Sequence, residues 1–109
     1  MKIAVVGSRN KTVCNIGNYL SDCDEIITGG ARGIDSCASE YAKSMNLKLT
    51  EFLPEYQHYG KAAPIIRNQK IVDYADKVIV FWDGFSKGSL SVIRYAQKTG
   101  KNLEIVLLD

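Results

Sequence analysis

Apolar residues occur along this chain in two patterns, short runs and stripes at helical spacing. Residues 2–7 and 77–82 are almost continuously apolar, as strands are when a parallel sheet buries both of their faces. Residues 25–28 and 102–108 predict two further strands. In residues 47–52 apolar and polar positions alternate, which predicts a half-exposed strand near an edge of the sheet.

The clearest helical pattern lies between residues 34 and 45. Its apolar positions recur every three or four residues and form one stripe, made of Ile34, Cys37, Ala38, Tyr41, Ala42 and Met45. Asn46 is a suitable C-terminal stop for this helix. The helix follows directly on a glycine-rich segment, so strand, turn and helix are expected in immediate succession.

Shorter apolar stripes predict three more helices, over residues 13–20, 64–74 and 89–99. Pro64 suits the first position of a helix, and Gly100 suits the residue just after a helix end. Residues 53–63 show no such period, and we expect an irregular connection there.

Five strands that alternate with four helices predict a parallel sheet with right-handed crossovers and helices on both faces. The fold class is therefore α/β, a single three-layer αβα domain over residues 1–109 with a five-stranded parallel sheet. Two strand orders are common for such sheets, 3-2-1-4-5 and 2-1-3-4-5. Glycine-bearing loops follow strands 1, 2 and 4, which are contiguous only in the first order. One shared crevice therefore requires the order 3-2-1-4-5, which we predict.

Composition narrows the functional classes only slightly. The chain has 109 residues, a hydrophobic fraction of 46% and a net charge of +2, which is too small to imply a polyanionic partner by itself. No segment predicts a signal peptide or a membrane span, so we expect a cytoplasmic protein without a membrane partner. Exposed helix faces leave a homo-oligomer open.

The cysteines and the single histidine do not form a metal-binding pattern. Cys14, Cys23 and Cys37 include no Cys-x-x-Cys pair, and His58 is the only histidine, so we expect no metal site. Cys14 and Cys37 fall on apolar helix positions, where a cysteine packs as a small hydrophobic residue. We assign His58 to the loop surface.

Four segments that can recognise an anion follow or adjoin strand ends. In a parallel sheet such segments meet at the carboxyl edge, where these folds bind ligands. Glycines let a phosphate approach the backbone, arginines offer bidentate contacts, and serine hydroxyls donate hydrogen bonds. Asp35 and Asp83 can accept hydrogen bonds from ribose hydroxyls. The predicted ligand-binding residues are Gly7, Ser8, Arg9, Gly29, Gly30, Ala31, Arg32, Gly33, Asp35, Arg67, Asn68, Asp83, Ser86, Gly88 and Ser89.

Each candidate also has a purely structural interpretation. Asp35 can complement a helix dipole, Asp83 can form a turn with the next glycine, and Ser89 can be a helix N-cap. Arg67 can be a solvated surface charge, and Trp82 can pack at the sheet edge. Taken singly, each residue favours the structural role, whereas their convergence on one sheet edge favours an anion or nucleotide pocket.

Two common nucleotide-binding motifs are missing. Gly7 is followed by Ser8-Arg9-Asn10 rather than by Gly-x-Gly-x-x-Gly, and no Gly-Lys-Ser/Thr closes a phosphate loop. Ordinary NAD dehydrogenase or nucleoside triphosphatase chemistry is therefore disfavoured. We expect no resident cofactor.

Four blocks in order resemble a known family: Val6-Gly7-Ser8-Arg9, residues 28–35, Arg67-Asn68 and residues 81–89. The chain looks like a small stand-alone member of the SLOG superfamily, the Rossmann-like group that unites Smf/DprA and LOG proteins. It is most similar to the YspA-like (DUF2493) branch. The resemblance covers nearly the whole chain. It implies a Rossmann-like domain that binds a nucleotide or nucleotide-derived ligand over the loops after strands 1, 2 and 4.

The resemblance implies three competing functions. Some SLOG domains are proposed nucleotide sensors, LOG enzymes cleave the N-glycosidic bond of nucleoside monophosphates, and Smf/DprA proteins bind single-stranded DNA. LOG enzymes carry a glutamate near the start of the fourth helix, but residues 88–94 here contain no acid, and glycosidic cleavage needs a carboxylate. We therefore expect a nucleotide-binding sensor or accessory module rather than an enzyme. The alternatives are a LOG-like N-glycosidic hydrolase or transferase and a DprA-like protein that binds single-stranded nucleic acid.

Overall fold

A computed structural model of the chain describes residues 1–13 and 15–108. Its five strands form one parallel sheet in the order β3-β2-β1-β4-β5, which confirms the predicted α/β fold and strand order. Successive strands pair in parallel from one edge to the other. The strands are β1 (Lys2–Gly7), β2 (Glu25–Thr28), β3 (Lys48–Glu51), β4 (Lys77–Trp82) and β5 (Asn102–Leu107).

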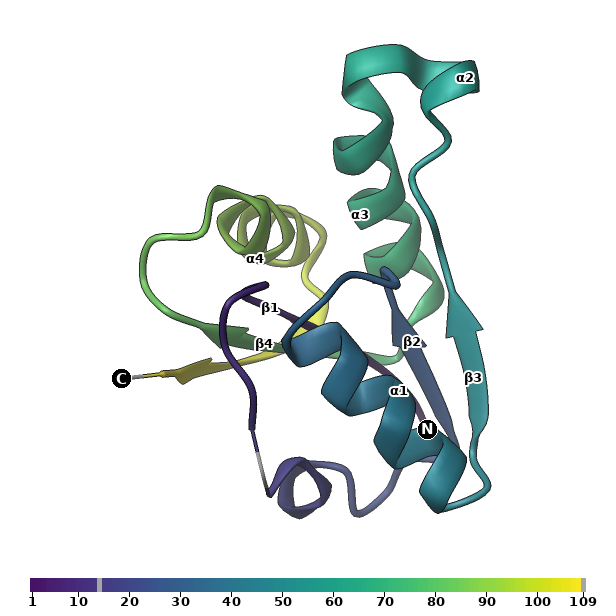
Figure 1. Cartoon of the computed structure of the whole chain (residues 1–109). Coiled ribbons are helices and arrows are strands. Elements are labelled where there is room, and N and C mark those ends of the chain that lie inside the picture. The colour runs from purple at the N-terminus through teal and green to yellow at the C-terminus, as the bar shows by residue number, and fades with distance from the viewer. Residues whose placement is uncertain (14, 109) are drawn as a thin grey trace.

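Helices cover both faces of this sheet, as Figure 1 shows. The α-helix α1 (Ile34–Ser44) and the 3-10 turn η1 (Ile16–Tyr19) lie on one face, and α3 (Ala63–Tyr74) and α4 (Lys87–Thr99) lie on the other. The arrangement is that of a Rossmann-like domain, in which each connection between parallel strands crosses a sheet face.

The sheet separates two hydrophobic cores, because successive strand residues point to opposite faces. In β1, Ile3 and Val5 join the core under α1, whereas Ala4 joins the core under α3 and α4. In β4, Phe81 belongs to the first core and Val80 to the second. Both central strands are therefore buried on both faces, as their continuous apolar runs predicted.

The prediction of a helix over residues 13–20 is wrong. The described residues of this segment form only the 3-10 turn η1, and neither Asn15 nor Leu20 at its ends has helical backbone angles. Gly17 in the middle of the turn lets the Tyr41 ring approach, because a Cβ on Gly17 would lie 2.7 Å from that ring. Ile16 and Leu20 are still buried, so the apolar spacing reflected core packing rather than a helix.

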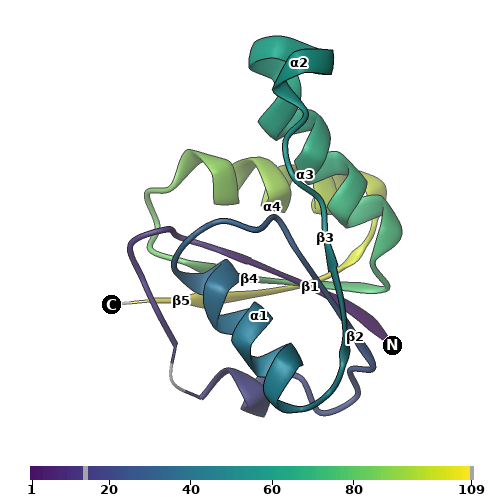
Figure 2. The same cartoon turned by 45° about the vertical axis from the view of Figure 1, so that its right-hand side comes forward.

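The irregular connection predicted over residues 53–63 is also wrong in part. It contains the single helical turn α2 (Tyr56–Tyr59) and the 3-10 turn η2 (Gly60–Ala62), which leads directly into α3. The two views agree that α2 and the start of α3 project beyond the sheet (Figures 1 and 2). His58 is exposed on this projection, on a short helix instead of a loop.

The fourth helix begins earlier than predicted. α4 starts at Lys87, and the Ser86 side chain caps it by accepting a hydrogen bond from the Ser89 N–H. Ser89 is therefore the third residue of the helix, and its alternative interpretation as the N-cap is wrong. The end of α4 is confirmed, since Gly100 adopts the left-handed conformation there, with φ of 70°.

Two of the cysteines can be placed in the structure. Cys23 and Cys37 are free, half-buried thiols that pack against the core under α1, as small hydrophobic residues do. Burial raises the pKa of the Cys23 thiol. Cys14, which was predicted to be a small buried residue of a helix, lies outside the described residues.

The loop after β2 packs directly on the loop after β1. Gly33 has a φ of 72°, and a Cβ at this position would lie 2.5 Å from the Arg9 carbonyl oxygen. The Ile34 N–H also donates a hydrogen bond of 3.4 Å to the Ser8 carbonyl. The two loops are therefore held backbone against backbone at the carboxyl edge of the sheet.

Gly33→Ala should destabilise the protein by about 1–3 kcal/mol, because the new side chain meets backbone atoms in a strained conformation. Gly88→Ala is the control, since a Cβ at Gly88 would meet nothing within 4 Å. Alanine within a helix is favoured over glycine by roughly 0.5–1 kcal/mol, so this variant should unfold at higher denaturant. Chemical denaturation of both variants measures the two effects, and equal stability would contradict the assignment of Gly33.

Candidate functional site

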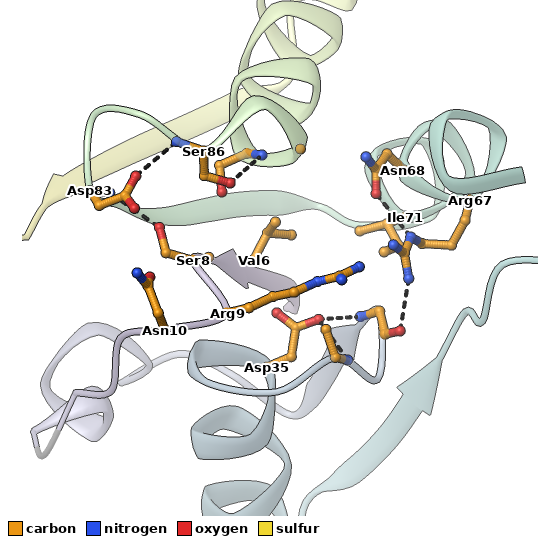
Figure 3. Close-up of a pocket in the computed structure, with 15 residues that line it drawn as sticks. Val6, Ser8, Arg9, Asn10, Asp35, Arg67, Asn68, Ile71, Asp83 and Ser86 are labelled. Atoms are coloured by element: carbon orange, nitrogen blue, oxygen red, sulfur yellow. Dashed lines mark hydrogen bonds between the residues drawn. The ribbon is translucent and has the colours of Figure 1, made fainter. Parts of the chain in front are cut away.

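The carboxyl ends of β1, β2 and β4 and the facing side of α3 enclose a cavity of about 410 Å³ (Figure 3). Most of the predicted site residues line it together. Those that do so are Gly7, Ser8, Arg9, Gly29, Ala31, Asp35, Arg67, Asn68, Asp83, Ser86, Gly88 and Ser89. The topological expectation that these loops share one crevice is therefore confirmed by their positions.

Three predicted residues lie outside this cavity. Gly30 and Arg32 line a neighbouring cavity of about 250 Å³, which shares Arg9 and Arg67 with the larger one. Gly33 lies beneath both loops and contacts the Ser8–Arg9 backbone. Its role is to hold the loops together, and Arg32 is an exposed cation at the adjoining cavity.

The cavity also contains three residues that the sequence analysis missed. Val6 and Ile71 supply apolar surface, and Asn10 extends the wall formed by the first loop. Two of them carried a usable signal. Val6 directly precedes Gly7 at the end of a strand, and Ile71 lies one helical turn beyond Arg67 and Asn68, on the same side of α3.

The glycine loop after β2 is closed by the protein's own carboxylate. The Oδ2 atom of Asp35 accepts hydrogen bonds from the N–H groups of Gly29 at 3.0 Å and Ala31 at 3.3 Å. The N–H of Gly30 donates to Thr28 Oγ1 at 3.2 Å. A phosphate at this loop would therefore compete with the Asp35 carboxylate for the same donors.

The other oxygen of Asp35 is left without a hydrogen bond. Asp35 is only 5% exposed, and its Oδ1 has no hydrogen-bond partner among the described residues. Burial raises the pKa of this carboxyl, although the N–H groups of Ala31 and Gly29 and the charges of Arg67 and Arg9 act in the opposite direction. One residue that lines the cavity thus has a buried carboxyl oxygen without a hydrogen-bond partner among the described residues.

The structural interpretation of Arg67 as a solvated surface charge is wrong. It is partly buried, and its Nη1 donates to the carbonyl oxygen of Gly29 at 2.8 Å and, more weakly, to that of Phe52 at 3.5 Å. Its Nε donates to Asn68 Oδ1 at 2.9 Å. Burial lowers the pKa of Arg67, partly offset by the negative charge of Asp35. Arg67 therefore fixes α3 to the end of β2.

Arg9 supplies a second cation from the opposite wall. Its side chain extends along the cavity above Asp35 and reaches toward Arg67 (Figure 3). Arg9 is exposed, and its charge contributes to the lowered pKa of Arg67. Two cations that disfavour each other in this way would both be stabilised by an anion between them.

The loop after β4 forms the remaining wall. Asp83 Oδ1 accepts hydrogen bonds from the N–H groups of Phe85 at 2.9 Å and Ser86 at 2.8 Å, which confirms its interpretation as a turn residue. These N–H groups lower the pKa of Asp83. The backbone N–H of Asp83 donates to Ser8 Oγ at 3.2 Å, so this wall is joined to the first loop.

Ser89 provides the second buried oxygen without a partner. It is 2% exposed, and its Oγ makes no hydrogen bond to any residue that the structure describes. Trp82, in contrast, packs against the core under α3 and α4 and donates from Nε1 to the Ser86 carbonyl at 3.0 Å. The packing role expected for Trp82 is therefore confirmed.

None of the helices within residues 1–13 and 15–108 has the length and apolar character needed to cross a membrane. Across the same residues, no three His, Cys, Asp or Glu side chains gather where they could hold a metal ion.

Comparison with known proteins gives a similarity to one phage protein. The chain is 35% identical over 81 residues to the Gene 61 protein of Mycobacterium phage D29, and the match covers 69% of this chain and 65% of that protein. The chain thus spans slightly less than two thirds of the length of this relative. No family model matches the sequence, and no solved structure matches it.

The two carboxyls of the cavity should affect stability with opposite dependence on pH. The raised pKa of Asp35 means that the folded state holds this proton more tightly than the unfolded state. The contribution of Asp35 to the free energy of unfolding therefore falls as pH rises from the ordinary carboxyl pKa through the raised pKa of the folded state. The lowered pKa of Asp83 has the opposite sign, so its stabilisation is lost as pH falls.

Denaturant unfolding between about pH 3.5 and pH 7 tests both signs, since carboxyls titrate in this range. The stability of Asp35→Asn should rise relative to the unmodified protein as pH increases, and that of Asp83→Asn should fall. Taking differences cancels the titration of all other groups. The same trend in both variants would contradict the two environments described above.

Proposed function

We propose that this protein binds a nucleotide or nucleotide-derived ligand in the 410 Å³ cavity, as a sensor or accessory module. The observation that carries this proposal is that Asp35 and Ser89, two residues lining one cavity, each have a buried oxygen with no hydrogen-bond partner among the described residues, Asp35 Oδ1 and Ser89 Oγ. Buried polar atoms without partners are costly in a folded protein. A ligand with donors and acceptors would satisfy both.

The first turn of α4 is the favoured place for a phosphate. Its backbone N–H groups lie at a helix N-terminus, where the dipole and the missing intrahelical partners favour an anion. Gly88 has open space where a side chain would be, and the Ser89 hydroxyl can donate a hydrogen bond. The loop after β2 is less suitable, because Asp35 already occupies its donors.

We also propose that the chain belongs to the SLOG superfamily. Support comes from the four sequence blocks of the resemblance, three of which contribute residues to the cavity wall directly after β1, β2 and β4. The fourth block contributes Arg67 and Asn68 from α3. Nucleotide binding at this edge is what the resemblance implies.

Ser89→Ala should weaken binding of a nucleoside monophosphate about 10- to 100-fold, because a hydrogen bond to a charged group contributes roughly 1.5–3 kcal/mol. Calorimetry with AMP, GMP, CMP and UMP measures this loss. The matched nucleosides, which lack the phosphate, should bind both proteins equally. Ser91→Ala is the control on the same helix, since Ser91 does not line the cavity.

Failure of all four monophosphates to bind the unmodified protein would contradict the proposed function. An equal loss of monophosphate affinity in Ser89→Ala and Ser91→Ala would instead contradict the proposed position of the phosphate. Thermal unfolding with and without ligand gives an independent check, because a ligand of the native state raises the apparent stability.

One observation favours N-glycosidic cleavage as a second candidate. Asp35 supplies the cavity with a buried carboxyl that has a free oxygen and a raised pKa, and such a group can protonate a leaving base or stabilise an oxocarbenium-like centre. Incubation with AMP should then release adenine, detected chromatographically, and Asp35→Asn should abolish the release. No adenine at high protein concentration would dismiss the enzyme.

A further inference from the structure

Two carboxylates line the cavity, and the structure separates their roles. Asp83 Oδ1 accepts hydrogen bonds from the N–H groups of Phe85 and Ser86 and so stabilises its own turn. In Asp35, only Oδ2 accepts hydrogen bonds from the protein, and Oδ1 is buried without a partner among the described residues. Of the two, Asp35 therefore has the greater unmet need for a donor.

The protein groups around Asp35 do not supply this donor. The N–H groups of Gly29 and Ala31 are directed to the other carboxyl oxygen. Two donors of Arg67 are taken up by Gly29 and Asn68. Arg9 reaches across the cavity above Asp35 (Figure 3) but makes no hydrogen bond to Oδ1. Because Asp35 lines the cavity, a ligand bound there is in a position to supply this donor.

The chemistry of a nucleotide limits what that donor can be. An ionised phosphate carries acceptors only and would be repelled by a carboxylate. A ribose hydroxyl is a neutral donor that can approach a carboxylate closely and relieve its buried oxygen. The base also carries N–H donors, but the sugar is bonded directly to the phosphate. With a phosphate at the first turn of α4, the sugar is therefore the next part of the ligand, ahead of the base.

We propose, resting on the nucleotide-binding function above, that Asp35 Oδ1 accepts a hydrogen bond from a ribose hydroxyl and makes the site selective for ribonucleotides over deoxyribonucleotides. A deoxy ligand fills the same space but leaves the buried oxygen unsatisfied. A site that is built around such a hydrogen bond rejects the analogue that lacks it far more strongly than a merely snug apolar pocket would. Single-stranded DNA is therefore a poor ligand for this cavity.

The test compares each of AMP, GMP, CMP and UMP with its 2′-deoxy and 3′-deoxy analogues by calorimetry. For the unmodified protein, loss of one of the two hydroxyls should weaken binding about 10- to 100-fold, as expected for a charge-assisted hydrogen bond. In Asp35→Asn this difference should disappear. Asparagine is nearly isosteric, and its Oδ1 can still accept from Gly29 and Ala31, while its amide presents a donor to the cavity.

Asp83→Asn is the matched control at the other carboxylate. It should keep the ratio of ribonucleotide to deoxyribonucleotide affinity, whatever it does to the absolute affinity. Circular dichroism and thermal unfolding establish that each variant is folded. Asp35→Glu is a second variant, which keeps the charge but moves the oxygen.

The outcomes separate the two proposals. Hydroxyl selectivity in the unmodified protein that vanishes in Asp35→Asn but persists in Asp83→Asn supports the inference. Nucleotide binding with equal affinity for ribo and deoxy ligands, or with selectivity unchanged in Asp35→Asn, overturns the inference and leaves the proposed function standing. Absence of binding by every nucleotide overturns both.

Discussion

The backbone of Gly29 makes hydrogen bonds through both its N–H and its carbonyl group, and the rest of the site depends on these two bonds. Its N–H donates to Asp35 at the start of α1, and its carbonyl accepts from Arg67 in the middle of α3. Helices from opposite faces of the sheet are thereby tied to the end of one strand. A Cβ at this position would lie 2.6 Å from Arg67 Nη1, so a side chain there would displace the guanidinium from the Gly29 carbonyl.

This arrangement explains how a glycine-rich turn can be essential without itself being the ligand contact. Three consecutive backbone N–H groups, from Gly29 to Ala31, find acceptors in the side chains of Asp35 and Thr28. The turn is anion-binding in character, as glycine turns at helix N-termini usually are, but its anion belongs to the protein. The remaining oxygen of that carboxyl group is buried and has no hydrogen-bond partner among the described residues.

The strands, the strand order and most of the cavity wall could be predicted from the sequence, because each depends on a local signal. Apolar runs define the strands, and a parallel sheet brings the segments after them to one edge. The failures have long-range causes. The apolar spacing of residues 13–20 reflects packing against the core, where Gly17 leaves room for the Tyr41 ring of another element. The roles of Asp35 and Arg67 depend on contacts across the sheet that no spacing along the chain reveals.

Most of the cavity wall is held in place by internal hydrogen bonds, through Arg67, Asp83, Ser86 and Ser8. The conformational entropy of these groups is lost when the chain folds, so ordering them does not weaken ligand binding. Arg9 differs, since it is exposed and lines both neighbouring cavities. For the binding that we propose, the cavity would combine a wall held by the protein with an adaptable Arg9 side chain, whose ordering would add to the entropic cost of binding.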